Sequence, residues 1–399
     1  MIIFFGGDRD ILPYFIKYGY KVVWFVHNNW NKEDEEFVEK CDKYVIDNYC
    51  VSQCLEILRN YNTDGAQCVS YHDSYHDLSK EVAAKLNLKA NYSSNANFIS
   101  KNKEIARKIS NDIFDLKVKY SLYNKNFSFK NIHKFKSFEY PIIVKPKLGT
   151  ASQNIVKVES FESLTSLMPL DNNMLIEEFI NGIEFSLEVV SHNGKHKVIL
   201  IAEKSLFPGT FVEKSHLIGT KFCNQVWDKA ELMVSRYLDK VGYENGISHI
   251  ELMFHDGLLG FVECQHRMGG GFISDAYFHL TNDSISEISY NIDFCQCFSI
   301  DEVATTRDIE RIVHIEFFHF FSPNFKLMST PYVINKAEIG SNGILDIGYT
   351  SKDLFESELL SGFDRDIHII LCGDSYEDIN NYRKQALNLI SPIFSVTGF

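Results

Sequence analysis

Hydrophobic and polar positions follow two different rhythms along the chain. In the N-terminal part, short apolar runs such as MIIFF (1–5) and KVVWFV (21–26) alternate with segments whose apolar positions have helical spacing. AQCVSYHD (66–73) predicts another buried strand, and residues 74–88 predict an amphipathic helix. Alternation of strand and helix is typical of a parallel sheet covered by helices. We therefore expect an α/β layer over residues 1–95.

The pattern changes beyond that layer. One helix is predicted over NANFISKNKEIARKISND (95–112), and period-two strands follow between residues 117 and 180. Residues 182–300 mix strands with at least one helix, and the last part of the chain contains short strands and a helix over 375–390. There is no repeat and no long linker, so we expect these parts to pack as one multidomain unit.

Composition narrows the class of protein. The chain has 399 residues, of which 45% are hydrophobic, enough for two or three domains with cores. No apolar run approaches the ~20 residues of a membrane helix, and the start, MIIFFGGDRD, does not resemble a signal peptide. Nine scattered cysteines without a CxxC pattern favour cytoplasmic thiols. A formal charge of −13 argues against nucleic-acid binding.

The stretch EYPIIVKPKLGTASQNIVKVES (139–160) predicts a hairpin with an unusual tip. Its loop holds the small residues Gly149, Thr150, Ala151 and Ser152, with two lysines, Lys145 and Lys147, at its mouth. Small residues let backbone N–H groups approach an anion, and the lysines supply charge. Neither GxxxxGK[ST] nor GxGxxG occurs. By itself the loop is equally compatible with a solvated hairpin tip.

A second stretch, MLIEEFINGIEFSLEVV (174–190), carries several carboxylates. Glu177 and Glu178 end one apolar strand, and Glu184, Ser186 and Glu188 share one face of the next. Such carboxylates could accept hydrogen bonds from an adenine amino group or from ribose hydroxyls. The alternative is a solvated strand face.

The third stretch, GISHIELMFHDGLLGFVECQHRMGGGF (246–272), is the most informative. Two strands flank the turn at 255–257, and each contributes one glutamate, Glu251 and Glu263. A three-residue loop would place both on one face, where like charges repel unless a divalent ion bridges them. Gln265 offers a third oxygen on that face, and Arg267 with the glycine run 269–271 adds a cation and close backbone approach. The alternative is a solvated hairpin followed by a flexible linker.

Two histidine groups are weaker candidates. His72, Asp73, His76 and Asp77 have the spacing of metal ligands, but a helix start capped by Asp73 or Ser74, with surface histidines, is the favoured interpretation. His314 and His319 are expected in a C-terminal strand.

Taken in order, these three stretches resemble the ATP-grasp superfamily, particularly carboxylate–amine ligases of the L-amino-acid (dipeptide) ligase type. The resemblance implies an α/β (α+β) ATP-grasp fold with three parts. These are a Rossmann-like parallel domain (1–95), a linker helix with a small lid subdomain (96–180), and an antiparallel-sheet catalytic domain (181–399) with a terminal α+β extension from about residue 305.

The resemblance also implies roles for individual residues. The ATP phosphates would lie near Lys103, Lys145, Lys147, Gly149, Thr150 and Ser152. Adenine would be held by Glu177, Glu178, Phe179 and Ile180, and ribose by Glu184. Mg²⁺ or Mn²⁺ would be bound by Glu251, Glu263 and Gln265, and catalysis would involve Arg267 and Gly270. The chain departs from the family pattern at Asn154, where a lid glycine is common, and at Gln265, where asparagine is usual.

The activity that the resemblance implies is ATP-dependent amide formation between a small-molecule carboxylate and an amine through an acyl phosphate. Amino acids are the expected substrates, and a homodimer is compatible with the resemblance. The substrate site is expected along residues 202–222, near Phe211, Glu213, His216 and Lys221. Two alternatives stay open: a carboxylase-like or purine-pathway ATP-grasp activity, and an ATP-binding regulatory module without turnover.

Overall fold

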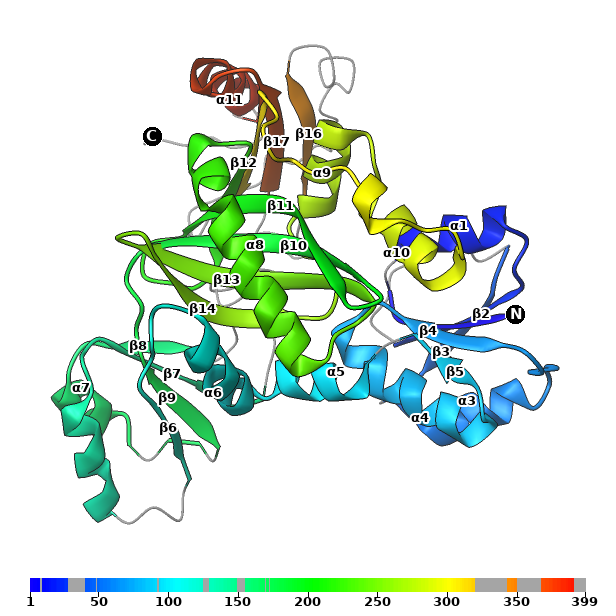
Figure 1. Cartoon of the computed structure of the whole chain (residues 1–399), viewed down its shortest axis with the longest axis horizontal. Helices are drawn as coiled ribbons and strands as arrows, with labels where there is room; N and C mark the ends of the chain where they lie inside the picture. Colours follow the sequence, from blue (N-terminus) through cyan, green and yellow to red (C-terminus); the bar gives the residue numbers. More distant parts are fainter. Residues whose placement is uncertain are drawn as a thin grey trace, which may run out of the picture.

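The fold is built on three β-sheets (Figure 1). The computed structural model describes residues 1–7, 9–27, 40–47, 49–91, 93–124, 129–148, 155–168, 170–171, 173–319, 343–349 and 367–390. None of the helices in these ranges is long and apolar enough to cross a bilayer. The mixed architecture, with one parallel and two antiparallel sheets, confirms the predicted fold class.

The N-terminal sheet has five parallel strands in the order β3-β2-β1-β4-β5. They are β1 (Ile2–Phe5), β2 (Val22–His27), β3 (Asp42–Ile46), β4 (Gln67–Ser70) and β5 (Lys89–Ala90). Helices α3 (Val51–Leu58) and α4 (His76–Leu86) bury their apolar side chains against one face. The other face packs on α1 (Leu12–Lys17) and on α10 (Ile285–Phe294), which comes from the distant C-terminal part. Short 3₁₀ turns precede α1 (Arg9–Ile11) and α4 (Asp73–Tyr75).

The single helix expected over 95–112 is wrong, because Asn102 interrupts it. The structure has α5 (Ser94–Lys101) and α6 (Lys103–Ile113), with Asn102 between them at φ −101° and ψ 88°. The Asn102 side chain accepts a hydrogen bond from the Ile105 N–H and so caps α6. Lys103 is therefore the first residue of α6, and its N–H donates to the Lys147 carbonyl.

The second sheet is a four-stranded antiparallel unit in the order β6-β9-β7-β8. Its strands are β6 (Tyr120–Tyr123), β7 (Ile142–Pro146), β8 (Val156–Val158) and β9 (Met174–Glu178), with α7 (Phe161–Ser166) and a 3₁₀ helix (Phe129–Ser137) beside them. It projects from the central body at the lower left of Figure 1. The predicted loop residues Gly149, Thr150 and Ser152 lie outside the described residues.

The central sheet has eight strands in the order β14-β13-β10-β11-β12-β15-β17-β16. These are β10 (Ile183–His192), β11 (Lys195–Leu206), β12 (Glu213–Ile218), β13 (Gly246–His255), β14 (Leu258–Gln265), β15 (Ile312–Phe318), β16 (Ile344–Tyr349) and β17 (Ile367–Gly373). His314 lies in β15, as predicted. The remaining helices are α8 (Lys221–Val241), α9 (Ile273–Thr281) and α11 (Tyr376–Ile390), with a 3₁₀ turn at Ile300–Glu302.

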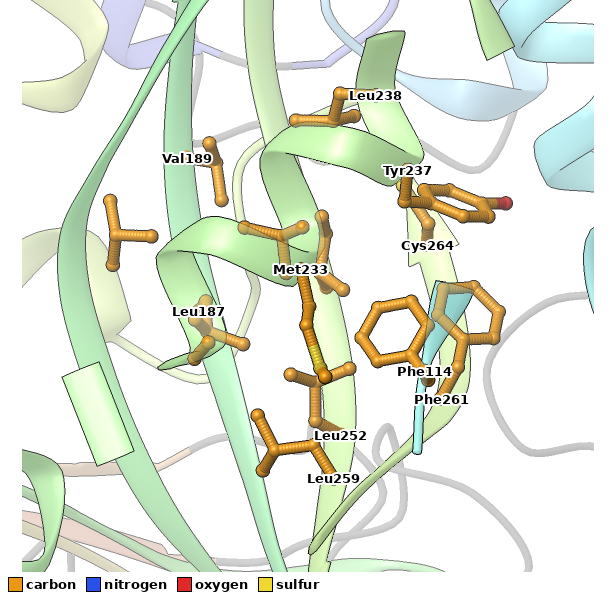
Figure 2. Close-up of a cluster of buried hydrophobic side chains, with 14 of the residues drawn as sticks. Phe114, Leu187, Val189, Met233, Tyr237, Leu238, Leu252, Leu259, Phe261 and Cys264 are labelled. Atoms are coloured by element: carbon orange, nitrogen blue, oxygen red, sulfur yellow. The ribbon is translucent and has the colours of Figure 1, made fainter. Parts of the chain in front are cut away.

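The largest apolar cluster fixes one face of this sheet. Figure 2 shows Met233, Tyr237 and Leu238 of α8 packed over Leu187 and Leu252 of the sheet. Alternate residues of β10 and β13 are therefore committed to this core. The polar residues between them point to the opposite face, where the candidate site lies.

The β13–β14 hairpin puts Glu251 and Glu263 opposite each other, although the predicted three-residue loop is wrong. Asp256 and Gly257 form a two-residue turn with φ values of 47° and 80°, and His255 pairs with Leu258. The register then shifts between Leu252 and Glu251, because β14 contains one additional residue in a β-bulge. The bulge restores the facing geometry that the two-residue turn alone would have destroyed.

Candidate functional site

A cavity of about 490 Å³ lies between the four-stranded sheet and the central sheet. Residues of β7 and β9, the segment after β9, and β10, β11, β13 and β14 form its walls. Among the predicted site residues, the structure brings Lys145, Glu177, Glu178, Phe179, Ile180, Glu184, Glu251 and Glu263 to this one cavity.

Two cations hold Glu177 in the cavity wall. Its carboxylate accepts hydrogen bonds from Arg107 Nε at 2.9 Å and Nη2 at 3.2 Å, and it forms an ion pair with the buried Lys145 ammonium. Burial alone would raise the pKa of Glu177, but Arg107 and then Lys145 outweigh it and lower the pKa to about 2. The predicted adenine contact of this side chain stays a prediction. Its observed partners make it a positioning group for Lys145.

The segment after β9 gives the cavity an apolar wall. The Glu178 carboxylate accepts from the Lys119 N–H at 3.3 Å and the Glu139 N–H at 2.8 Å, so its oxygens hold the backbone just before β6 and before β7. Phe179 and Ile180 line the cavity beside them. An apolar wall suits a flat base, although the Phe179 N–H already donates to the Pro141 carbonyl at 3.0 Å. The predicted adenine position stays a prediction.

Lys204 is the centre of a buried charge cluster that the sequence did not reveal. Its Nζ lies 2.7 Å from a Glu184 oxygen, 2.8 Å from Glu251 Oε1 and 3.7 Å from a Glu213 oxygen. Burial alone would lower the pKa of Lys204, but Glu184, Glu251 and Glu213 raise it well above its ordinary value. Glu184, expected to hold ribose, is therefore paired with a lysine in this structure.

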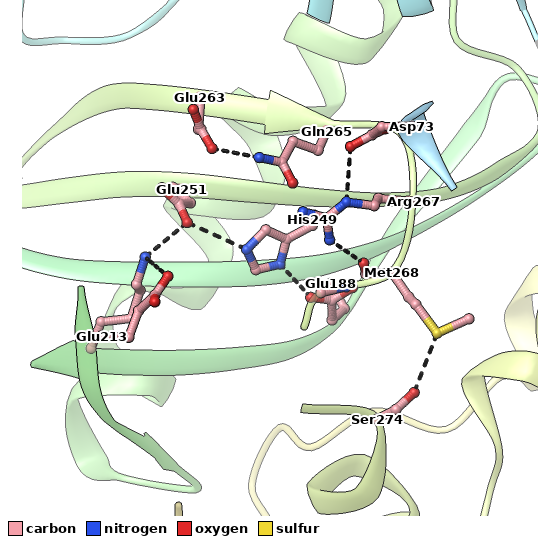
Figure 3. Close-up of polar contacts among 12 residues, drawn as sticks. Asp73, Glu188, Glu213, His249, Glu251, Glu263, Gln265, Arg267, Met268 and Ser274 are labelled. Carbon is pink, nitrogen blue, oxygen red and sulfur yellow. Dashed lines mark hydrogen bonds and ion pairs between the residues drawn. The ribbon is translucent and has the colours of Figure 1, made fainter. Parts of the chain in front are cut away.

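The facing carboxylates Glu251 and Glu263 and the Gln265 amide are the groups predicted to bind a metal ion. Gln265 Nε2 donates to Glu263 Oε1 at 2.6 Å, while Gln265 Oε1 is buried without a hydrogen-bond partner (Figure 3). Within the described residues no group of three His, Cys, Asp or Glu side chains has metal-binding geometry. Two carboxylates and an unsatisfied amide oxygen still fit a hard divalent cation, which prefers oxygen ligands.

Lys103 faces the same carboxylates from α6. The pKa of its ammonium is lowered, mainly by burial. Glu263 is the strongest charge that opposes this shift, and nearby Lys145 adds to the lowering. Lys103 and Lys145, separated by more than 40 positions in the sequence, thus act on each other electrostatically. Lys147 differs, because its Nζ lies 2.6 Å from the Glu104 carboxylate in a more exposed position.

The position of Arg267 differs from the sequence-based expectation. Strand β14 ends at Gln265, so strand alternation does not govern Arg267. Its Nε donates to Asp73 Oδ2 at 2.8 Å, and its Nη1 donates to the Met268 carbonyl at 2.6 Å (Figure 3). Arg267 therefore contacts the N-terminal domain and is not among the residues lining the cavity. Open space lies above Gly270, where an added Cβ would meet nothing within 4 Å.

The surface position predicted for the histidines around Asp73 is wrong. His72 caps the 3₁₀ turn through Nδ1, which accepts from the Ser74 N–H. His76 is buried at the domain contact, and burial lowers its pKa to about 4. Asp73 is also buried, and its carboxylate forms an ion pair with Arg267.

Sequence reasoning missed three residues that shape the site: Arg107, Lys204 and His249. It placed Glu188 on the correct strand face but did not predict its partner His249. Arg107 follows Lys103 by four positions, so helical spacing could have placed it on the same face. His249 precedes Glu251 by two positions and shares its strand face. Burial alone would lower the pKa of His249, but Glu188 outweighs burial and raises it to about 9. Lys204 stands in the apolar run VILIAEKSL, where a lone cation was a usable signal.

Comparisons with known proteins identify a domain family within the chain. Residues 138–275 match the ATP-grasp domain family. The D-alanine–D-alanine ligase of Flavobacterium psychrophilum is 24% identical over 147 residues, covering 34% of this chain and 44% of that protein. The corresponding ligase of Pediococcus pentosaceus is 34% identical over 150 residues, covering 35% and 42%. The chain thus spans less than half the length of either curated relative.

Solved structures share the fold over nearly the whole chain. The L-amino acid ligase of Bacillus licheniformis has a TM-score of 0.76 at 15% identity, covering 97% of this chain and 96% of that one. The N5-carboxyaminoimidazole synthase of Aspergillus clavatus, in complex with ADP and 5-aminoimidazole ribonucleotide, has a TM-score of 0.74 at 10% identity, covering 98% and 99%. A biotin carboxylase domain from Hydrogenobacter thermophilus has a TM-score of 0.70 at 12% identity, covering 97% and 89%.

Proposed function

The chain has an ATP-grasp domain within an ATP-grasp fold, and from this premise we propose that it is an ATP-dependent carboxylate–amine ligase. The observation that supports this most strongly is the convergence of two lysines and two facing glutamates around one cavity. Lys145 and the pair Glu251–Glu263 line that cavity, and Lys103 faces Glu263 from the start of α6. Cations beside paired carboxylates are what a triphosphate with a divalent ion requires.

In this proposal ATP lies in the cavity with its base against Phe179 and Ile180 and its phosphates toward Lys103 and Lys145. Lys145 is held by its ion pair with Glu177, and Lys103 stands on the first turn of α6, which the Asn102 side chain caps. Fixed cations stabilise charge on the transferred phosphoryl group without reorganising during the reaction. Lys147 would add a further cation near the phosphates.

Glu251, Glu263 and Gln265 would hold Mg²⁺ or Mn²⁺, which when bound would neutralise charge on the phosphates. Glu184 would retain Lys204 or turn to the ribose hydroxyls.

A substrate carboxylate oxygen would attack the γ-phosphorus, and the bond to ADP would break to give an acyl phosphate. An amine would then attack the acyl carbon and lose a proton, and phosphate would leave with the C–O bond electrons. Arg267 and the backbone at Gly270 are the proposed donors to the developing oxyanion. Asp73 would hold the Arg267 guanidinium in position.

The test is a phosphate-release screen with Mg·ATP and amino acids, singly and in pairs, including both D- and L-enantiomers. We expect release that depends on one carboxylate and one amine, with an amide detected by mass spectrometry. Substrate labelled with ¹⁸O in the carboxylate should transfer one ¹⁸O to phosphate, which diagnoses an acyl phosphate.

The alternatives give different results in the same assay. Turnover that requires bicarbonate, with or without biotin, would indicate a carboxylase-like or purine-pathway activity. Nucleotide binding without phosphate release from any pair would indicate a regulatory module. Glu263→Gln should abolish the release and serves as the background control.

A further inference from the structure

Glu188 and His249 form a buried pair beside the candidate metal site. They are directly opposed in the register of β10 and β13, and His249 Nδ1 lies 2.6 Å from Glu188 Oε1. Glu188 is completely buried, and His249 is 7% exposed. Both side chains are buried, and neither is among the residues lining the cavity, so the proposal gives them no contact with ATP.

The same pair holds the start of the glycine run. The Gly269 N–H donates to the second oxygen, Glu188 Oε2, at 3.1 Å. A Cβ on Gly269 would lie 2.6 Å from His249 Nδ1 and closer still to Glu188 Oε1. Gly269 has no left-handed φ, so the requirement for glycine here comes from space. The backbone leading to Gly270 therefore rests directly on the pair.

The other end of the imidazole faces the metal site. His249 Nε2 lies 3.5 Å from Glu251 Oε1, the same oxygen that contacts Lys204 (Figure 3). One ring thus connects Glu251, Glu188 and, through Glu188, the Gly269 backbone. These contacts join the strand of the phosphoryl-transfer site to the segment proposed for the acyl-transfer step.

Stability alone does not account for such a pair. Buried ion pairs can often be replaced by apolar residues of similar volume without loss of stability. Groups that orient metal ligands through a second layer of contacts typically change activity or metal affinity by about 10–100-fold when removed. We propose that Glu188 and His249 are positioning residues that hold Glu251 and the Gly269–Gly271 backbone in register for the two chemical steps. This inference rests on the proposed ligase function.

The kinetic test uses Glu188→Gln, His249→Gln and the double variant with a substrate pair identified by the phosphate-release screen. We expect kcat to fall about 10–100-fold while KM for ATP changes little, because the proposal gives neither residue a contact with ATP. The double variant should be no worse than the poorer single variant, since the two residues act as a unit.

Glu316→Gln provides a matched control. Glu316 is a buried carboxylate in β15 of the same sheet, paired with Arg383 Nη2 at 2.8 Å, and it is not among the cavity-lining residues. It should lower the melting temperature without lowering kcat per folded molecule. Unchanged kcat in folded Glu188→Gln and His249→Gln would overturn the proposal.

A second readout is independent of turnover. In protein labelled with [¹⁵N]histidine, the ring resonance lost in His249→Gln should shift when Mg·ADP is added, because the ring touches Glu251. A shift without turnover from any substrate pair would support the positioning pair and count against the ligase function. A resonance that does not move with Mg·ADP would overturn the link between His249 and the metal site.

Discussion

The carboxylates of Glu251 and Glu263 face each other because β14 has one residue more than β13 between the hairpin turn and the pair. Leu252 pairs with Phe261, and Glu251, the residue before Leu252, pairs with Glu263. Val262 therefore has no partner residue on β13. A one-residue change in register moves a side chain to the other face of a sheet. The proposed metal site therefore depends on this bulge as much as on the glutamates themselves.

Glu263→Gln is expected to weaken Mn²⁺ binding by at least about tenfold, because one of two carboxylate ligands becomes neutral. Binding can be followed by electron paramagnetic resonance with a non-hydrolysable ATP analogue present. Asp256→Asn is the matched control, since it removes the same charge from the exposed turn of the same hairpin. An equal loss of Mn²⁺ affinity in both variants would show that the effect comes from net charge and not from a ligand role of Glu263.

Lys204→Met should lower the melting temperature in metal-free buffer, because Glu184 and Glu251 would lose the cation that lies within 3 Å of both. Added Mn²⁺ should restore more stability to the variant than to the wild-type protein, since an ion can replace the lost charge at Glu251. The measurement is thermal unfolding across a Mn²⁺ series. A deficit that is independent of Mn²⁺ would separate Lys204 from the metal site.

Arg267→Lys should retain ATP binding but lose amide formation by about 10²–10³-fold, the usual cost of one misplaced electrostatic contact. A lysine cannot reproduce the planar group that bonds both Asp73 and the Met268 carbonyl. Comparing ADP formation with amide formation should also reveal uncoupled ATP hydrolysis. Near-normal product formation would make Arg267 a structural link between domains.

Asp293→Asn is expected to stabilise the protein at neutral pH. Burial raises the pKa of Asp293 from 3.8 to about 6, although Tyr71 and Asn91 donate hydrogen bonds to it. As the pH rises from 4 to 6 the unfolded chain loses this proton first, so the carboxyl destabilises the folded state. The side chain is only partly buried, and we expect a cost of about 2 kcal/mol above pH 6.

Urea unfolding at pH 4, 5, 6 and 7.5 checks this prediction. The stability difference between Asp293→Asn and wild type should grow across that range and then level off. Asp64→Asn, at an exposed position, should show no such growth. A difference that is constant with pH would contradict the raised pKa.

Local patterns were sufficient to predict the N-terminal α/β layer, while the fold class as a whole came from the resemblance to the ATP-grasp superfamily. The strand ends carrying Lys145 and Glu177 could be located because apolar runs stop there. Local patterns could not predict the Asn102 break, where a side-chain cap competes with a continuous helix, or the bulge at Val262. Pairings such as Lys204 with Glu251 and Arg267 with Asp73 depend on tertiary distances, which no local spacing encodes.

The helix α10 has a consequence for how the chain can be divided. Its Tyr290 and Phe294 rings pack against Phe15, with centroids 5.7 and 5.4 Å away, although they follow the central sheet in sequence. A fragment that begins after residue 95 would expose these rings to water as an apolar, aggregation-prone surface. We expect such a fragment to self-associate, because the N-terminal layer covers this apolar surface in the whole chain.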